Sequence, residues 1–106
     1  MIIRSRTLRG WLKANFDNDQ LEDMADHGCS AGWPGLTYYR DTMKLYAKFA
    51  DEIWQMAYEE TDALGAKNVL DLIAGFSGAD NVSGQATFEN LMVWFACETI
   101  ARELTD

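Results

Sequence analysis

The apolar residues between positions 45 and 64 recur at steps of three and four, and this spacing limits the possible folds more than any other feature of the sequence. They are Leu45, Tyr46, Phe49, Ile53, Trp54, Ala57 and Leu64. Residues with this spacing lie on one face of an α-helix, whereas a half-buried strand requires strict alternation. The pattern predicts a long central helix that begins near Asp41 and ends at Gly65.

Short polar residues that cap helix N-termini precede several other apolar clusters, and a single proline, Pro34, interrupts the chain. Helices are therefore the default along the sequence. The predicted caps are Thr7 for a first helix, Asp17 or Asn18 for a second, Asn68 for a short helix after the central one, and Ser83 or Thr87 for the last. We expect the second helix to stop at Gly28 and the last to end near Glu103.

The last predicted helix is apolar on nearly every face, because residues 91 to 97 read Leu-Met-Val-Trp-Phe-Ala-Cys. A helix that is hydrophobic all round is normally buried among others. A buried strand is the alternative for this run, but the sequence lacks convincing strand partners. We therefore predict an all-α fold, a compact bundle of about five helices around a buried C-terminal helix. Residues 1–106 are expected to form a single domain, because the chain is too short for two cores.

Two stretches are predicted to be loops. Residues 28–35 hold three glycines and the proline, which favour turns over helix. We expect Trp33, within this first loop, to pack back into the core. The polar residues from Ser77 to Gly84 form the second predicted loop.

Cysteine usage and the N-terminal segment bear on the cellular compartment. Cys29 and Cys97 match no C-x-x-C pattern, and two core thiols are favoured over a disulfide between them, which stays an alternative. Residues 1–16 carry four bases and no acid, as targeting peptides do, but the apolar stripe that begins at Leu8 favours a first core helix. No apolar run reaches the roughly 18 residues of a membrane span. We expect the protein in the cytoplasm of a bacterial host cell.

One motif suggests catalysis but lacks the necessary context. Gly28-Cys29-Ser30-Ala31-Gly32 matches G-x-S-x-G, the nucleophile turn of α/β-hydrolases. That turn requires a strand before it and a histidine later in the chain, whereas the sole histidine, His27, comes earlier. We therefore predict no catalytic residues, although an enzyme that uses this loop is kept as a minor alternative.

Metal and cofactor sites also lack support in the sequence. A structural zinc site needs four Cys or His ligands, and the chain has three such residues. His27 is interpreted instead as a residue that favours the C-terminus of a helix. Di-metal carboxylate bundles need two Glu-x-x-His motifs, and no stretch has P-loop spacing. We expect no metal and no cofactor.

The charge is unevenly distributed along the chain. The net charge is −8, and the first 13 residues contain four of the nine bases and none of the 17 acids, so the remaining residues carry −12. This excess disfavours direct binding to nucleic acid or to an anionic membrane, because phosphate binding depends on Lys and Arg. It favours a basic partner, with solubility alone as the alternative.

Two groups of acids are the predicted partner-binding residues. The first group is Asp17, Asp19, Glu22, Asp23 and Asp26, and the second, on the central helix, is Asp51, Glu52, Glu59, Glu60 and Asp62. If the second helix lies beside the central one, these acids form one continuous negative surface. Such a surface resembles a nucleic-acid backbone and would fit a basic groove.

Four segments of the chain carry a resemblance to known proteins. They are Ala25-Asp26-His27-Gly28, then Gly32-Trp33-Pro34-Gly35-Leu36-Thr37-Tyr38-Tyr39, then Glu52-Ile53-Trp54, and Leu91-Met92-Val93-Trp94. Together they resemble a family of small, uncharacterised acidic proteins of bacteriophages and plasmids. The resemblance covers most of the chain and supplies no catalytic residues. In size and charge the chain is similar to anti-CRISPR proteins, which implies an inhibitor of a host defence machine.

These observations lead to two functional hypotheses. The first is a non-enzymatic inhibitor, encoded by a phage or mobile element, whose acids bind a basic surface of a host protein or ribonucleoprotein of the CRISPR or restriction type. The second is a structural or accessory protein that forms a homodimer or joins a virion through exposed aromatic residues. The aromatic residues expected at that contact are Trp33, Tyr38 and Tyr39.

Overall fold

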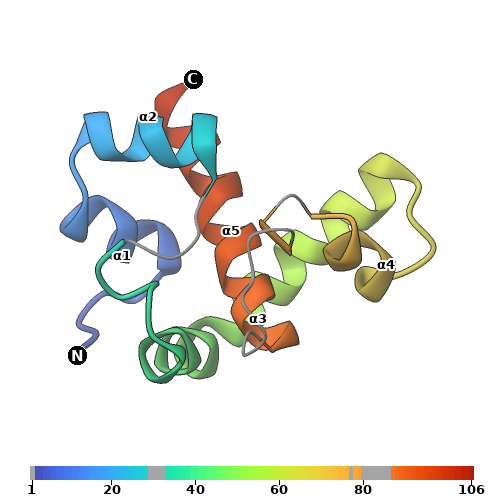
Figure 1. Cartoon of the computed structure of the whole chain (residues 1–106), viewed down its shortest axis with the longest axis horizontal. Helices are drawn as coiled ribbons and strands as arrows, with labels where there is room; N and C mark the ends of the chain where they lie inside the picture. The colour runs from blue at the N-terminus through green and yellow to red at the C-terminus, as the bar shows by residue number, and fades with distance from the viewer. Residues whose placement is uncertain (1, 29–32, 77, 80–86) are drawn as a thin grey trace.

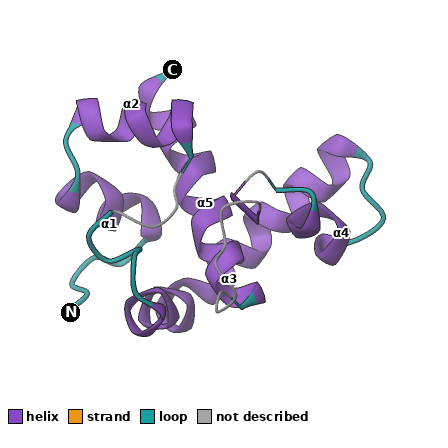
Figure 2. Cartoon of the chain, in the orientation of Figure 1, coloured by secondary structure: helices purple, strands orange, loops and turns teal. Residues whose placement is uncertain are grey.

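The chain folds into helices joined by short connections (Figure 1, Figure 2). The structure is a computed structural model that describes residues 2–28, 33–76, 78–79 and 87–106. The helices are α1 (Leu8–Asn15), α2 (Asn18–His27), α3 (Tyr39–Leu64), α4 (Val69–Ala74) and α5 (Phe88–Thr105). No strand occurs in these ranges, so the predicted all-α fold is confirmed.

Polar side chains cap four of the helices at predicted positions. Thr7, Asp17, Asn68 and Thr87 each accept a hydrogen bond from the backbone N–H three residues later. At Asp17 and Thr87 the side chain of that later residue in turn accepts a hydrogen bond from the backbone N–H of the cap, which satisfies a second orphan group. Each such cap stabilises a helix start by about 1 kcal/mol. Ser83, the other candidate cap for the last helix, lies outside the described residues.

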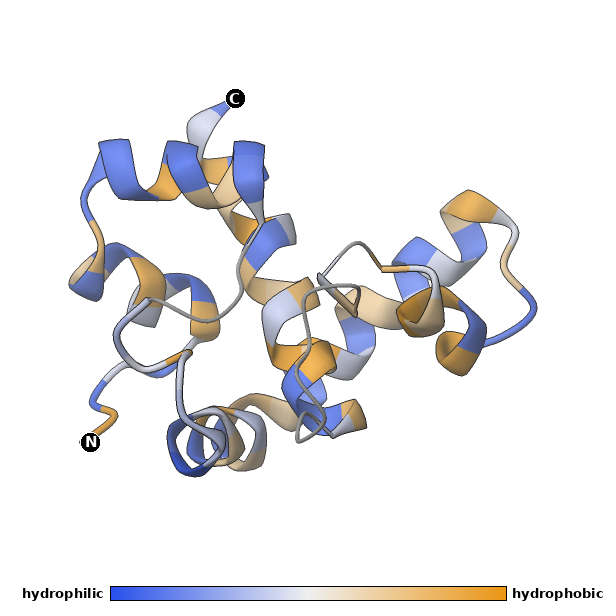
Figure 3. Ribbon diagram, in the orientation of Figure 1, coloured by the Kyte–Doolittle hydropathy of each residue, from blue (hydrophilic) through white to orange (hydrophobic). Residues whose placement is uncertain are grey.

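α5 lies at the centre of the bundle. All of its residues from Met92 to Cys97 are buried, as the apolar run predicts. α2 and α3 pack on it most extensively, and α1 and α4 also contact it. Hydrophobic residues run through the middle of α5, whereas α2 is mostly hydrophilic (Figure 3). The C-terminal helix is therefore surrounded by the others.

α3 ends at Gly65 as predicted and begins two residues before Asp41, the predicted start, but it is bent. Phe49 has φ −114° and ψ 21°, outside the helical range, and its side chain is buried. A straight helix of 26 residues is about 39 Å long at 1.5 Å per residue. The longest dimension of the whole molecule is 34 Å. The bend thus keeps both parts of α3 within the bundle. A straight helix of this length would extend beyond it.

The segment between α2 and α3 is fastened to the core by two tryptophans. The ring of Trp33 is half-buried and meets Phe16 edge-on at 5.7 Å between ring centroids, so its predicted return to the core is confirmed. Leu36 is fully buried, and its carbonyl oxygen accepts a hydrogen bond from Trp94 Nε1 at 3.0 Å. Residues 29–32 and most of the predicted loop from Ser77 to Gly84 lie outside the described residues.

Two further expectations concern thiols and membranes. Cys97 is a buried free thiol, as expected for a core cysteine. Cys29 lies outside the described residues. Among the helices that the structure describes, none is long and apolar enough to cross a membrane.

Candidate functional site

The first predicted group of acids lies on the exposed side of α2. Leu21 and Met24 are the buried residues of this helix, which packs on α5, and Glu22 and Asp26 line a polar hollow with Arg102 of α5. Asp17, Asp19, Glu22, Asp23 and Asp26 are all exposed. Only Asp23 takes part in an ion pair within the described chain, with His27 Nδ1 at 2.8 Å. The exposed side of α2 is therefore strongly negative.

The second group of acids is less uniform. Asp51, Glu59 and Asp62 are exposed on α3, whereas Glu52 and Glu60 are half-buried. Glu52 has an internal role, because its two carboxylate oxygens accept hydrogen bonds from the backbone N–H of Leu8 at 3.0 and 3.1 Å. A carboxylate is favourable at a helix N-terminus, where the helix dipole is positive. Glu52 thus stabilises α1 rather than offering a free surface charge.

The structure does not bring the two acidic groups together. α2 and α3 each pack on α5, and they are not among the closely packed helix pairs of the described chain. They therefore occupy different faces of α5 (Figure 1). One continuous negative surface would require α2 to lie beside α3. In the structure α5 separates these two helices, so the condition is not met.

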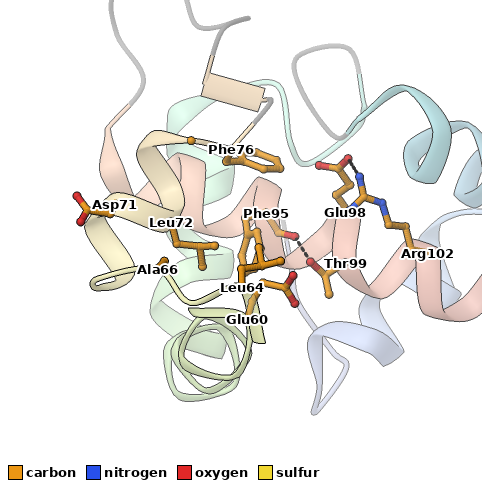
Figure 4. Close-up of a pocket in the computed structure, with 11 residues that line it drawn as sticks. Glu60, Leu64, Ala66, Asp71, Leu72, Phe76, Phe95, Glu98, Thr99 and Arg102 are labelled. Atoms are coloured by element: carbon orange, nitrogen blue, oxygen red, sulfur yellow. Dashed lines mark hydrogen bonds and ion pairs between the residues drawn. The ribbon is translucent and has the colours of Figure 1, made fainter. Parts of the chain in front are cut away.

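A pocket of about 380 Å³ lies between the C-terminal end of α3, α4 and α5 (Figure 4). Its apolar walls are formed by Leu64, Leu72, Phe76 and Phe95, and the polar groups around it are Glu60, Asp71, Glu98, Thr99 and Arg102. The rings of Phe76 and Phe95 meet edge-on at 5.9 Å between centroids. Figure 4 shows Asp71 at one end of this pocket and Glu98 with Arg102 at the other.

Glu98 is the most unusual residue in the pocket. It is only 3% exposed, and its Oε1 accepts a hydrogen bond from Arg102 Nη2 at 2.7 Å. Its Oε2 is also buried and has no hydrogen-bond partner in the described part of the chain. Burial raises the pKa of Glu98 above its ordinary 4.5, and the Arg102 guanidinium opposes this rise. A buried carboxylate with one unpaired oxygen is a costly feature for a fold to keep.

Glu98 is not among the site residues that were predicted from the sequence. Glu98 and Arg102 are four residues apart on α5, in the order that favours an ion pair on a helix. The signal was a single acid directly after the apolar run of residues 91 to 97. The run predicts that all faces of this helix are buried, and an acid on such a helix must then be buried as well.

The residues considered for metal binding or catalysis are only partly described, because residues 29–32 lie outside the described ranges. In the ranges that the structure describes, no three His, Cys, Asp or Glu side chains are grouped to hold a metal ion. His27 is exposed and pairs with Asp23. Of the Gly28–Gly32 motif, only Gly28 lies within the described residues.

The aromatic residues of the alternative hypothesis are divided between surface and core. Tyr38 and Tyr39, at the start of α3, are 70% and 53% exposed. Trp33 is instead half-buried against Phe16. Only the two tyrosines therefore remain as an exposed aromatic pair.

Comparison with known proteins gives one match. The protein-family model described as Domain of unknown function (DUF7222) matches residues 3–106, which is nearly the whole chain. Neither a curated protein nor a solved structure matches. The match agrees with the resemblance to an uncharacterised family.

Proposed function

We propose that this chain, which belongs to the DUF7222 family, acts without catalysis by binding the basic surface of a host protein or ribonucleoprotein. In its specific form, the proposal is a phage or mobile-element inhibitor of a CRISPR or restriction complex. The exposed side of α2 is the binding surface. On the partner, it occupies a basic groove that otherwise holds nucleic acid.

The observation that carries this proposal is the set of unpaired acids on α2. Asp17, Asp19, Glu22 and Asp26 form no ion pair within the described chain, and the basic residue that shares a hollow with Glu22 and Asp26, Arg102, is paired with Glu98 instead. Acids presented on one rigid helix attract a basic groove over a distance and align it. The acids of α3 lie on another face of α5 and include Glu52, which holds α1. This favours α2 over α3 as the binding surface.

Binding to a purified CRISPR surveillance complex and to a restriction enzyme, measured at rising salt concentration, tests the proposal. We expect affinity to fall with salt, because exposed charges are screened. A variant with Asp19→Asn, Glu22→Gln and Asp26→Asn should bind about tenfold more weakly, since each exposed pair contributes less than about 1 kcal/mol. Asp17 is left unchanged because it caps α2.

The matched comparison is a variant with Asp51→Asn, Glu59→Gln and Asp62→Asn, three exposed acids of α3. It has the same net charge as the α2 variant, so a general charge effect weakens both equally. Equal weakening contradicts α2 as the binding surface. Absence of binding to both kinds of complex contradicts the specific inhibitor role.

The exposed pair Tyr38 and Tyr39 favours a second candidate function, a structural protein that associates with itself. Tyrosines are enriched in protein interfaces, where the ring packs and the hydroxyl stays hydrated. Sedimentation of the isolated protein at low and high salt discriminates between the two functions. A dimer that persists at high salt and is lost in the double variant Tyr38→Ser and Tyr39→Ser supports the second, and a monomer at all concentrations excludes it.

A further inference from the structure

We propose that the pocket between α3, α4 and α5 receives one lysine or arginine side chain of the partner, with Glu98 as its buried counterion. This inference rests on the proposed function, because the side chain belongs to the proposed partner. No residue of α2 lines the pocket, and Arg102 lies between it and the hollow that holds Glu22 and Asp26 of α2. The pocket would therefore add a specific anchor beside a surface that acts mainly by charge.

The unpaired oxygen of Glu98 is the first reason. Oε2 is buried without a hydrogen-bond partner in the described chain, although Oε1 of the same carboxylate is paired. Leaving such an atom unsatisfied costs more than a typical hydrogen bond contributes. An ammonium or guanidinium group supplies the missing donor and the opposite charge together, which a neutral ligand does not.

The walls of the pocket provide the second reason. Lysine and arginine carry their charge on an apolar stem, and such stems pack along hydrophobic surface. Leu64, Leu72, Phe76 and Phe95 offer that surface along the pocket. Glu60 and Asp71 also line it and bring the number of carboxylates to three. The pocket thus combines apolar walls with an excess of negative charge, the complement of a long basic side chain.

Arg102 provides the third reason. Its guanidinium already pairs with Glu98, which shows that the carboxylate accepts this group in good geometry. The Arg102 side chain is 59% exposed and also lines a second, polar hollow with Glu22, Asp26 and Asp106. Arg102 can therefore exchange one carboxylate for others when a cation arrives from the partner. In the free protein Arg102 occupies part of the place that the partner side chain takes.

Binding of a cation should also release a proton. Burial raises the pKa of Glu98, and a second positive charge beside it favours the ionised form. The charged groups that face Glu98 across the pocket are Arg102 on α5, Glu60 on α3 and Asp71 on α4. Affinity for a cation is thus expected to rise with pH through the pKa of Glu98 and then to level off.

The pocket is tested with side-chain mimics followed by NMR. The cationic probes are n-butylammonium and n-propylguanidinium, and the matched controls are 1-butanol and butyrate. The cationic probes should shift the Leu64 and Leu72 methyl resonances and the Glu98 carboxyl carbon in a saturable way, and more strongly at neutral than at acidic pH. Shifts of equal size with 1-butanol, or no shifts with the cations, overturn the inference.

Two variants change the affinity in opposite directions. Glu98→Gln keeps an acceptor for Arg102 but removes the charge, and should weaken the cationic probes about tenfold or more. Glu89→Gln, with the same charge change on the first turn of α5 and outside the pocket, is the control. Arg102→Met removes the competing guanidinium and keeps an apolar stem, so the probes should bind severalfold more tightly. An unchanged or lower affinity in Arg102→Met overturns the exchange.

The same variants separate this inference from the proposed function. Suppose that the host complex binds Glu98→Gln as tightly as the parent protein but binds the α2 variant weakly. The proposed function then stands, and the insertion of a partner side chain into the pocket is overturned. If the probes bind through Glu98 but the host complex does not bind at all, the proposed function fails. In that case the pocket's preference for cations stands, and a partner side chain is overturned as the occupant.

Discussion

Both carboxylate oxygens of Glu52, on α3, accept a hydrogen bond from the backbone N–H of Leu8, at 3.0 and 3.1 Å. Glu52 thereby caps α1, which begins 44 residues earlier in the chain. Leu8 itself is fully buried at the start of α1. The contact joins the N-terminal helix to the central one at a point where the backbone of α1 has no partner of its own. The Thr7 side chain accepts a hydrogen bond from the N–H two residues further on, that of Gly10.

Replacing Glu52 with alanine should therefore destabilise the protein by about 2 kcal/mol, because the part-buried N–H of Leu8 loses a charged acceptor. The measurement is the free energy of unfolding from urea titration followed by tryptophan fluorescence. Asp51→Ala, at the exposed neighbouring position, is the control and should change stability by no more than about 0.5 kcal/mol. Equal effects of the two substitutions would show that Glu52 acts only as a surface acid.

The helices and their caps could be predicted from the sequence because their causes are local. The spacing of Leu45, Phe49 and Ile53 and the side chains of Thr7 and Asp17 act within a few residues of themselves. The burial of the C-terminal helix followed from its own composition. For these features the sequence contains the whole physical argument.

The bend in α3 and the roles of Glu52 and Glu98 depend on packing between distant segments. No local pattern places the Glu52 carboxylate at Leu8, since the contact is set by how α1 meets α3. Likewise, the pocket forms only after α3 and α4 have packed on α5. Whether α2 lies beside α3, the condition for one continuous acidic surface, could not be predicted for the same reason, because the periodicity of each helix does not say which helix is its neighbour.

The stability of the protein should depend on pH through Glu98. Burial raises the pKa of this carboxyl above its ordinary 4.5, so the folded chain binds the proton more tightly than the unfolded chain. The resulting stability is fully present below the ordinary pKa and is lost as pH rises through the raised one. Glu98→Gln is neutral throughout, and should therefore gain stability relative to the parent as pH rises from the ordinary pKa of Glu98 through the raised one.

Urea unfolding of parent and variant at several pH values measures this difference. The charged groups around Glu98 are Arg102, Glu60 and Asp71. Because Arg102 opposes the rise in pKa, Arg102→Met should lose stability more steeply than the parent over the same range. Parallel stability curves for the parent and Glu98→Gln would mean that the Glu98 carboxyl is not perturbed by folding.

Trp94→Phe should destabilise the connection between α2 and α3. The indole N–H of Trp94 donates to the buried carbonyl of Leu36 at 3.0 Å, and phenylalanine keeps an aromatic ring, smaller than indole, but removes this donor. A loss of about 1–2 kcal/mol is expected from the carbonyl left without that donor. Trp54→Phe is the comparison, because its N–H donates to the Tyr46 hydroxyl at a half-buried site where water can substitute. A loss at Trp94 no larger than at Trp54 would argue against a role of this bond.

Hydrogen exchange locates the effect of Trp94→Phe. The amide of Leu36 donates to the carbonyl of Trp33, so its protection reports directly on this connection. It should exchange faster in the variant, whereas amides in the middle of α3 should change only by the global loss of stability. Uniform acceleration along the chain would show that Trp94 stabilises the bundle as a whole.

Two glycines at helix ends should respond in opposite ways to the same substitution. Gly65 ends α3 with φ 66°, in the left-handed region, and an added Cβ there would meet no neighbour within 4 Å. Gly65→Ala should cost about 1 kcal/mol through the backbone alone, and Gly65→Asn less, because asparagine tolerates this conformation. Gly75 ends α4 at φ −87°, with no neighbour closer to an added Cβ than 3.6 Å. Gly75→Ala should therefore stabilise the protein by about 0.5 kcal/mol by restricting the unfolded chain, and equal unfolding free energies for the two alanine variants would contradict the left-handed end of α3.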